Sequence, residues 1–207
     1  MTFLSIVLYY IHNHGGHVSY KTVSFKGSKR KLLTHIEKRI KEVEPTEVLD
    51  GFSGTGIVSA HLRFLGYKVY ASDKMPSCNL FASVFLNGFD LTAVAKHIEH
   101  INWLTGRSGW ITGNYAGERK RLIKGVNQVE SRPLGFTEAN AMKLDVARDY
   151  AELIANENDR NAVIFSIILA MDKAFNNTND QKSCLKDWTA AALSDIVFEI
   201  PTLTQGK

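Results

Sequence analysis

The sequence predicts an α/β fold in which helices cover an open, mostly parallel sheet, followed by a helical or irregular insertion. The first observation is a unit of strand, glycine-rich turn, helix and strand between Glu47 and Asp73. The second is an amphipathic helix directly before this unit. The third is a change to polar, glycine-punctuated sequence after Leu104. Strands that alternate with helices in this way are typical of doubly wound sheets.

The elements of the first half follow from apolar periodicity and from turn residues. Residues 29–42 place apolar side chains at helical spacing with charges on the opposite face, which predicts a helix. Pro45 ends this pattern, and residues 47–50 predict a short buried strand that ends at an acidic residue. The helix and the second strand that complete the unit are predicted at residues 57–65 and 67–71.

The second half is predicted to be mostly helical after an irregular start. Six glycines punctuate the polar stretch between Gly106 and Gly135, and this spacing favours loops. Apolar periodicity predicts helices on both sides of this stretch, at residues 77–87, 138–156, 161–175 and 184–193. The last of these leads into an apolar run at residues 196–200.

Length, charge and cysteine content limit the classes of protein to which this chain can belong. A chain of 207 residues that is 44% hydrophobic can bury one substantial core, with or without a sizeable insertion. The formal charge of +4 is compatible with a polyanionic partner but carries little weight alone. Cys78 and Cys184 form no C-x-x-C pair, which argues against zinc and disulfide frameworks and favours the reducing cytoplasm.

Membrane and metal partners are not expected. The apolar run at residues 3–11 is too short to span a bilayer, and no basic residue precedes it as in a secretory signal. His12, His14 and His17 follow closely, but no acidic or thiol ligand lies near them in the sequence. A solvated turn is therefore favoured over a metal site.

The segment Gly51-Phe-Ser-Gly-Thr-Gly56 is the sharpest signal of a ligand site. Its glycines allow the backbone to turn tightly, and the helix that follows offers unpaired N–H groups to a ligand. Asp73 lies seventeen residues after Gly56, where a carboxylate at a strand end can accept both hydroxyls of a ribose. The alternative is a plain strand-to-helix turn with Asp73 as a solvated strand end.

The loop differs from two common nucleotide-binding motifs. A P-loop needs a lysine after its last glycine, but Ile57 follows Gly56. The glycine spacing G-x-x-G-x-G also differs from the G-x-G-x-x-G of dinucleotide folds. Asp50, directly before the loop, suits the cationic amino-acid end of S-adenosylmethionine and would repel a pyrophosphate.

Two segments carry a family resemblance. Phe25-Lys-Gly-Ser-Lys-Arg-Lys-Leu-Leu33 resembles the N-terminal motif of D12 class DNA adenine methyltransferases, an aromatic residue followed by x-G-S-K and a helix. Asp50-Gly-Phe-Ser-Gly-Thr-Gly56 resembles the cofactor motif of that class, usually D-P-F-x-G-[TS]-G, with glycine in place of proline. Residues 109–115, 136–145 and 170–174 are similar to the middle region of larger restriction-modification members. The resemblance covers about residues 25–201 in the order of the family.

The resemblance implies a Rossmann-like S-adenosylmethionine-dependent methyltransferase fold with an incomplete sheet and a helical or irregular insertion. It also implies a cofactor pocket in which one group of residues encloses the methionine end, a second forms the floor and a carboxylate holds the ribose. The first group is Phe25, Gly27, Ser28 and Lys29. The second is Asp50, Phe52, Gly54 and Gly56, and the carboxylate is that of Asp73. For Lys29, a solvated position among neighbouring basic residues is an equal alternative.

The resemblance divides the chain into four parts. An N-terminal extension covers residues 1–24, and the S-adenosylmethionine-binding Rossmann-like region covers residues 25–104. Residues 105–194 form the helical insertion, which is expected to recognise the DNA target. Residues 195–207 are expected to begin the return of the chain to the sheet that carries the catalytic motif.

A basic stretch in the insertion is the candidate contact with double-stranded DNA. Lys and Arg side chains bind phosphates, and nearby aromatic rings can flank a displaced base. A solvated loop is the alternative, but the family places target recognition after its cofactor motifs. The candidate DNA-binding residues are Arg119, Lys120, Arg121 and Lys124, with Arg132, Trp110 and Tyr115 nearby.

The catalytic motif of the family is missing from this sequence. That motif is Asp/Asn-Pro-Pro-Tyr/Phe, which holds the adenine amino group and stacks on the flipped base. The chain has no Pro-Pro pair, since its four prolines are Pro45, Pro76, Pro133 and Pro201. No catalytic residue is therefore assigned, and relatives are expected to continue beyond Lys207 toward the catalytic strand.

Three interpretations of the function follow from these observations. The first is a site-specific DNA adenine N6-methyltransferase of which this chain is a fragment or one subunit, inactive alone. If the chain is one subunit, a second polypeptide that carries the catalytic motif is an expected partner. The alternative is a non-catalytic DNA-binding or regulatory module that retains a nucleotide-type pocket. A methyltransferase that acts on another substrate is a third reading, because a fold alone does not define a substrate.

Overall fold

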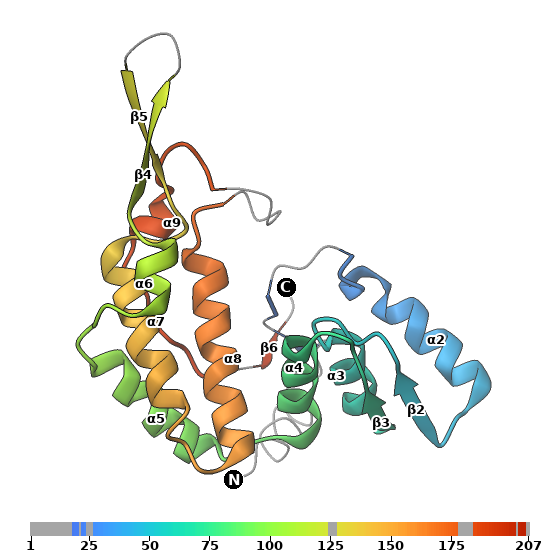
Figure 1. Cartoon of the computed structure of the whole chain (residues 1–207). Coiled ribbons are helices and arrows are strands. Elements are labelled where there is room, and N and C mark those ends of the chain that lie inside the picture. The colour runs from blue at the N-terminus through green and yellow to red at the C-terminus, as the bar shows by residue number, and fades with distance from the viewer. Residues whose placement is uncertain are drawn as a thin grey trace.

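A computed structural model describes residues 18–20, 22–23, 27–123, 128–177, 184–201 and 203–205. Two halves lie side by side, as Figure 1 shows. The smaller half contains the helices α2, α3 and α4 with the strands β2 and β3. The larger half is a bundle of the helices α5 to α9, from which the hairpin of β4 and β5 projects.

The smaller half is built around one parallel strand pair. Its elements follow a short 3-10 turn, Arg30–Leu32, and are α2 (Leu33–Val43), β2 (Glu47–Asp50), α3 (Ile57–Phe64), β3 (Lys68–Ala71) and α4 (Pro76–Asn87). The strands β2 and β3 run parallel, with Glu47 opposite Lys68 and Asp50 opposite Ala71. Because the strands are parallel, with α3 as the crossover between them, both end at the same edge of the pair. The predicted helices and strands of this half are confirmed to within a few residues. The expectation that the strand at residues 47–50 is buried was wrong, because Glu47 and Leu49 are exposed and Val48 and Asp50 are half-buried.

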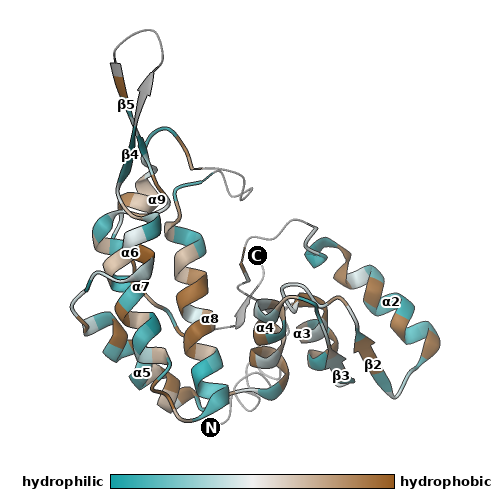
Figure 2. Cartoon of the chain, in the orientation of Figure 1, coloured by the Kyte–Doolittle hydropathy of each residue, from teal (hydrophilic) through white to brown (hydrophobic). Residues whose placement is uncertain are grey.

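The larger half is organised by its longest helix. Its helices are α5 (Leu91–Trp103), α6 (Trp110–Tyr115), α7 (Glu138–Ala151), α8 (Glu157–Ala174) and α9 (Ala190–Leu193). The middle of α8 is apolar around much of its circumference, as Figure 2 shows. Such a helix needs neighbours on several sides, and α8 packs against α4, α5, α7 and α9.

The helix α8 also joins the two halves. The Phe165 ring of α8 lies 5.3 Å from the Phe81 ring and 5.5 Å from the Phe85 ring, centroid to centroid. Both partner rings belong to α4, and all three side chains are buried. The core is therefore continuous from the small α/β half into the helical bundle.

The remaining strands form two further small sheets. β1 (Val18–Tyr20) pairs antiparallel with β6 (Leu203–Gln205), and β4 (Glu118–Ile123) pairs antiparallel with β5 (Gln128–Pro133). The described chain is thus a mixed α/β protein with three two-stranded sheets. The prediction of an irregular stretch after Leu104 was wrong in part, because this stretch contains α6 and the hairpin. The helix predicted at residues 184–193 is also shorter, since only α9 is helical there.

The apolar run at residues 196–200 is extended and lies on the helices. The side-chain amide of Asn102 on α5 accepts from the N–H of Phe198 and donates to its carbonyl, both at 2.9 Å. Asn140 on α7 accepts from Ile196 N at 2.9 Å and donates to the carbonyl of Ser194 at 2.9 Å. Side chains therefore take the place of a neighbouring strand, and the expected return to a sheet stays a prediction.

Within the described residues, no helix combines the length and the apolar character that crossing a bilayer requires.

Candidate nucleotide and DNA sites

The loop between β2 and α3 is attached to the end of β3. Ser72 N donates to the carbonyl of Asp50 at 2.9 Å, and Ser53 N donates to the carbonyl of Ser72 at 3.2 Å. The loop then turns sharply, since Gly54 and Gly56 have φ values of 52° and 74°. Side chains disfavour this left-handed region, so the path of the loop depends on these two glycines.

Gly56 also allows α3 to approach α4. A Cβ atom at Gly56 would lie 3.2 Å from the Cα and N atoms of Ala82 and from the Phe85 ring. In contrast, a Cβ atom at Gly51 would meet nothing within 4 Å. The glycines of the loop are therefore not equivalent, a difference that their spacing in the sequence does not reveal.

The carboxylate of Asp73 lies against the glycine loop. Its Oδ2 atom accepts from Gly54 N at 2.9 Å, and its Oδ1 atom accepts from Met75 N at 3.0 Å. These two amide hydrogen bonds, with that from Met75 the stronger influence, hold the pKa of Asp73 below its ordinary value. Asp73 is thus an ionised acceptor beside the loop at neutral pH.

Asn79 fixes the backbone of Asp73, although nothing in the sequence pattern singled it out. Its Oδ1 atom accepts from Asp73 N at 2.8 Å, and its Nδ2 atom donates to the Asp73 carbonyl at 2.9 Å. Asn79 lies in the first turns of α4. The start of this helix therefore orients the carboxylate proposed for the ribose.

Two hydroxyl groups near the start of α3 complete this site. Ser59 Oγ donates to Asp50 Oδ2 at 2.7 Å. The Ser53 hydroxyl is buried and has no hydrogen-bond partner in the described part of the chain. A buried hydroxyl without a partner is unfavourable, so a polar ligand atom at the loop would satisfy it. The donor and acceptor groups present here fit a nucleoside-type cofactor such as S-adenosylmethionine.

Other predicted cofactor residues lie apart from these contacts. Phe25 falls outside the described residues. Gly27, Ser28 and Lys29 are exposed before α2, where Lys29 Nζ donates to the carbonyl of Gly27 at 2.9 Å. The Phe52 side chain is 95% exposed. In the described part of the chain, Asp50, the glycine loop and Asp73 therefore lie together. The hydrogen bonds given for Gly27, Ser28 and Lys29 do not connect the N-terminal motif to them.

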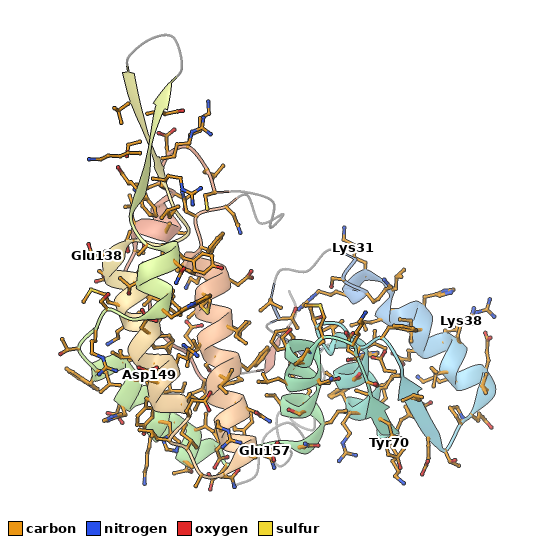
Figure 3. All side chains as sticks on the ribbon, viewed as in Figure 1. Lys31, Lys38, Tyr70, Glu138, Asp149 and Glu157 are labelled. Carbon is orange, nitrogen blue, oxygen red and sulfur yellow. The ribbon has the colours of Figure 1, made fainter. Side chains whose placement is uncertain are left out.

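The β4–β5 hairpin carries most of the predicted DNA-binding residues. In its register Arg119 lies opposite Arg132, and Lys120 lies opposite Ser131. Because side chains alternate along a strand, Arg119 and Arg132 share one face of the ribbon and Lys120 lies on the other. Figure 3 shows nitrogen-bearing side chains that project from this ribbon. The Arg121 side chain and Lys124 fall outside what the structure describes.

The acidic residues of the hairpin are partly engaged within the protein. Glu118 accepts from Ser131 Oγ at 2.5 Å, and this bond together with one from Trp188 holds the pKa of Glu118 below its ordinary value. Glu130 forms an ion pair with Arg132 at 2.9 Å. The Glu118 face therefore lies toward Trp188, and the face of Arg119 and Arg132 lies away from it.

Metal ligands do not cluster in the part of the chain that the structure describes. No group of three or more His, Cys, Asp or Glu side chains there could hold a metal ion.

Comparison with known families identifies the lineage of the chain. The model of the family described as D12 class N6 adenine-specific DNA methyltransferase matches residues 25–202. No curated protein and no solved structure gives a significant match. The matched span includes the glycine loop, Asp73 and the β4–β5 hairpin, and this family generally uses S-adenosylmethionine. The chain therefore belongs to the D12 class N6 adenine-specific DNA methyltransferase family.

Proposed function

We propose that this chain is the S-adenosylmethionine-binding and DNA-binding part of a site-specific DNA adenine N6-methyltransferase. The contact of Asp73 Oδ2 with Gly54 N, at the carboxyl ends of two parallel strands, is the observation that carries this proposal. Ligands of α/β proteins bind at this edge of the sheet. The proposal includes a Rossmann-like arrangement of residues 25–104, with recognition of double-stranded DNA by residues 105–194.

Each predicted residue has a role in the proposed cofactor site. Asp73 holds the ribose, and Asp50 lies toward the cationic amino-acid end. Bound S-adenosylmethionine supplies the sulfonium methyl group that is transferred to adenine N6. By resemblance to the family, Phe25, Gly27, Ser28 and Lys29 would enclose the methionine end, and Asp50, Phe52, Gly54 and Gly56 would form the floor. The buried Ser53 hydroxyl joins this floor as a further polar contact.

The cofactor site can be tested with Asp50→Asn, which removes the charge and keeps the shape of the side chain. We expect titration calorimetry with S-adenosylmethionine to show binding to the wild type that is weakened about tenfold or more in this variant. Glu47→Gln is the matched control, because it removes a carboxylate from the other end of β2. Equal affinity of the two variants would argue against Asp50 as a ligand. DNA binding without any cofactor binding would favour the non-catalytic DNA-binding or regulatory module.

The β4–β5 ribbon is proposed to contact the phosphates of double-stranded DNA. Residues 118–133 contain five basic and two acidic residues. A two-stranded ribbon fits the major groove, and positive side chains release counterions when they bind phosphates.

Removal of one arginine from this ribbon has a defined expected result. Arg119→Gln should weaken DNA binding similarly for all sequences and reduce the slope of log K against log salt by about 0.9. Fluorescence anisotropy with labelled duplexes at several salt concentrations measures this slope. Lys38→Gln on α2 is the control, because it removes an exposed positive charge from the other half. The same slope for wild type and Arg119→Gln would place the ribbon away from the DNA.

Methyl transfer is proposed to need the family's catalytic motif from outside these 207 residues, either from a longer protein of which they are a fragment or from a second polypeptide. The 207 residues contain no Pro-Pro pair, so they lack the Asp/Asn-Pro-Pro-aromatic motif that holds and stacks the target adenine. We expect the purified chain to transfer no labelled methyl group from S-adenosylmethionine to DNA that contains many candidate sites. Robust methylation by the purified chain, without an added subunit, would contradict this part of the proposal.

A further inference from the structure

A groove of about 670 Å³ is lined by α5, by α7 and by the extended segment at residues 195–197. We call it the α5–α7 groove. Trp103 ends α5 and lines the groove although it is 82% exposed, and Val197 lines it and is 60% exposed. An indole with this exposure contributes little to the packing of its own domain, whereas tryptophan is enriched where proteins bind one another.

The α5–α7 groove has a fixed shape before any partner binds. The side-chain amides of Asn102 and Asn140 hold the extended segment against α5 and α7. Trp103 follows Asn102 directly, and Val197 lies between the two residues whose N–H groups these amides bind. A preformed groove binds a partner at a lower cost in entropy than a surface that must first be ordered.

The α5–α7 groove is acidic, although the chain as a whole has a formal charge of +4. Glu99 lines it from α5 and Asp195 lines it from the extended segment. Neither carboxylate forms an ion pair within the described part of the chain. Lys143 on α7 also lines the groove, but its Nζ donates to the carbonyls of Asn102 and Leu104 at the end of α5. The two carboxylates therefore remain available to a cation from outside.

We propose that the α5–α7 groove docks a basic segment of a partner protein. An arginine or lysine side chain of this segment lies on the Trp103 ring, between Glu99 and Asp195. Tryptophan is the aromatic side chain that attracts a cation most strongly, and the carboxylates add charge-assisted hydrogen bonds. The apolar stem of the same side chain covers Val197. Nucleic acid does not fit this surface, because its phosphates would meet two carboxylates.

The proposed docking surface is separate from the proposed cofactor and DNA sites. None of the residues that line the α5–α7 groove belongs to the glycine loop or to the β4–β5 hairpin. A partner that occupies the groove therefore leaves these sites accessible. Changes in the groove should leave the affinities for S-adenosylmethionine and for duplex DNA unchanged.

Two short labelled peptides test the charge of the occupant. One alternates arginine with serine, and the other has citrulline in place of each arginine, which keeps the shape and removes the charge. We expect fluorescence anisotropy at low salt to show that the full chain prefers the arginine peptide by about tenfold or more. Trp103→Ala and Glu99→Gln should each weaken binding of the arginine peptide about fivefold.

Matched variants separate the groove from other exposed side chains. Trp110→Ala removes a second indole, which is 59% exposed on α6 and does not line the groove. Glu152→Gln removes an exposed carboxylate that follows α7 and does not line the groove. Both control variants should bind the arginine peptide as the wild type does.

Three results would overturn the inference. Equal affinity of the wild type for the two peptides would show that the groove does not select a cation. Equal weakening in Trp103→Ala and Trp110→Ala, or no weakening in either, would place the peptide elsewhere. A wild-type dimer in size-exclusion chromatography that becomes a monomer in Trp103→Ala would assign the groove to a second copy of this chain.

Discussion

Replacement of Asp145 with alanine is expected to lower the free energy of unfolding by about 3 kcal/mol. Asp145 lies on α7 with only 3% of its surface exposed. Its Oδ1 atom accepts from Ile111 N at 2.8 Å, and its Oδ2 atom accepts from Thr112 N at 2.9 Å and Thr112 Oγ1 at 2.7 Å. The variant leaves these donors without their acceptor at the start of α6, where the helix itself offers none.

Urea unfolding of Asp145→Ala measures this loss of stability, and Asp149→Ala is the control, because it removes a carboxylate from the surface of the same helix. Asp149 lies one turn further along α7 and forms an exposed ion pair with Arg107 at 2.9 Å. Such pairs contribute about 1 kcal/mol or less, so the control should unfold nearly as the wild type does. Similar losses in both variants would contradict the role of Asp145 in fixing α6 to α7.

The same carboxylate predicts a dependence on pH. Burial raises the pKa of Asp145, but hydrogen bonds from Thr112, Ile111 and Gly109 lower it by more, so the pKa is below its ordinary value. The stabilisation is complete above the unfolded pKa of about 3.9 and is lost as the pH falls through the folded value. The stability difference between wild type and Asp145→Asn should therefore shrink in strong acid. A constant difference from pH 7 to pH 2 would contradict this assignment.

The second large effect is expected from Gly56→Ala, which should lower the free energy of unfolding by about 2 kcal/mol. The same variant should also weaken cofactor binding. The alanine must adopt the left-handed φ of 74°, which is unfavourable for an L-residue. Its Cβ atom would also lie 3.2 Å from the backbone of Ala82, so α3 and α4 must separate. Thermal unfolding and titration with S-adenosylmethionine measure the two consequences.

Gly51→Ala is the matched control within the same loop. A Cβ atom there meets nothing within 4 Å, and the φ of Gly51 is not in the left-handed region. Its stability should change by about 0.5 kcal/mol or less. If the two variants lose equal stability, the close approach of α3 to α4 is not what requires glycine at position 56.

The α/β half was predictable from sequence because local rules determine its elements. The strand at residues 47–50 ends where the first glycine of the loop begins, and α3 starts directly after Gly56. Glycine placement and apolar periodicity both act over a few residues, so they define boundaries well. The approach of Asp73 to the loop could be expected for the same reason, since parallel strands end at one edge.

The hairpin was missed because most of its described side chains are exposed, so the pairing of its strands and not an apolar pattern defines it. The segment Glu118-Arg-Lys-Arg121 has no alternation of apolar and polar residues, which is the usual sign of a strand.

The sequence also did not predict the roles of Ser53 and Asn79 in the site. The Ser53 hydroxyl is buried without a partner in the described part of the chain, and the Asn79 amide holds the backbone of Asp73. Both features depend on the path of the folded backbone and leave no pattern in the sequence.

The two asparagine side chains that hold the extended segment have a consequence for the order of folding during synthesis. Asn102 binds Phe198, which is 96 positions later in the chain, and Asn140 binds Ile196, which is 56 positions later. Contacts across such separations form late, because a long loop must close first. The helical bundle therefore reaches its final packing only after residue 198 has left the ribosome, whereas the glycine loop and Asp73 can assemble while the rest is still being translated.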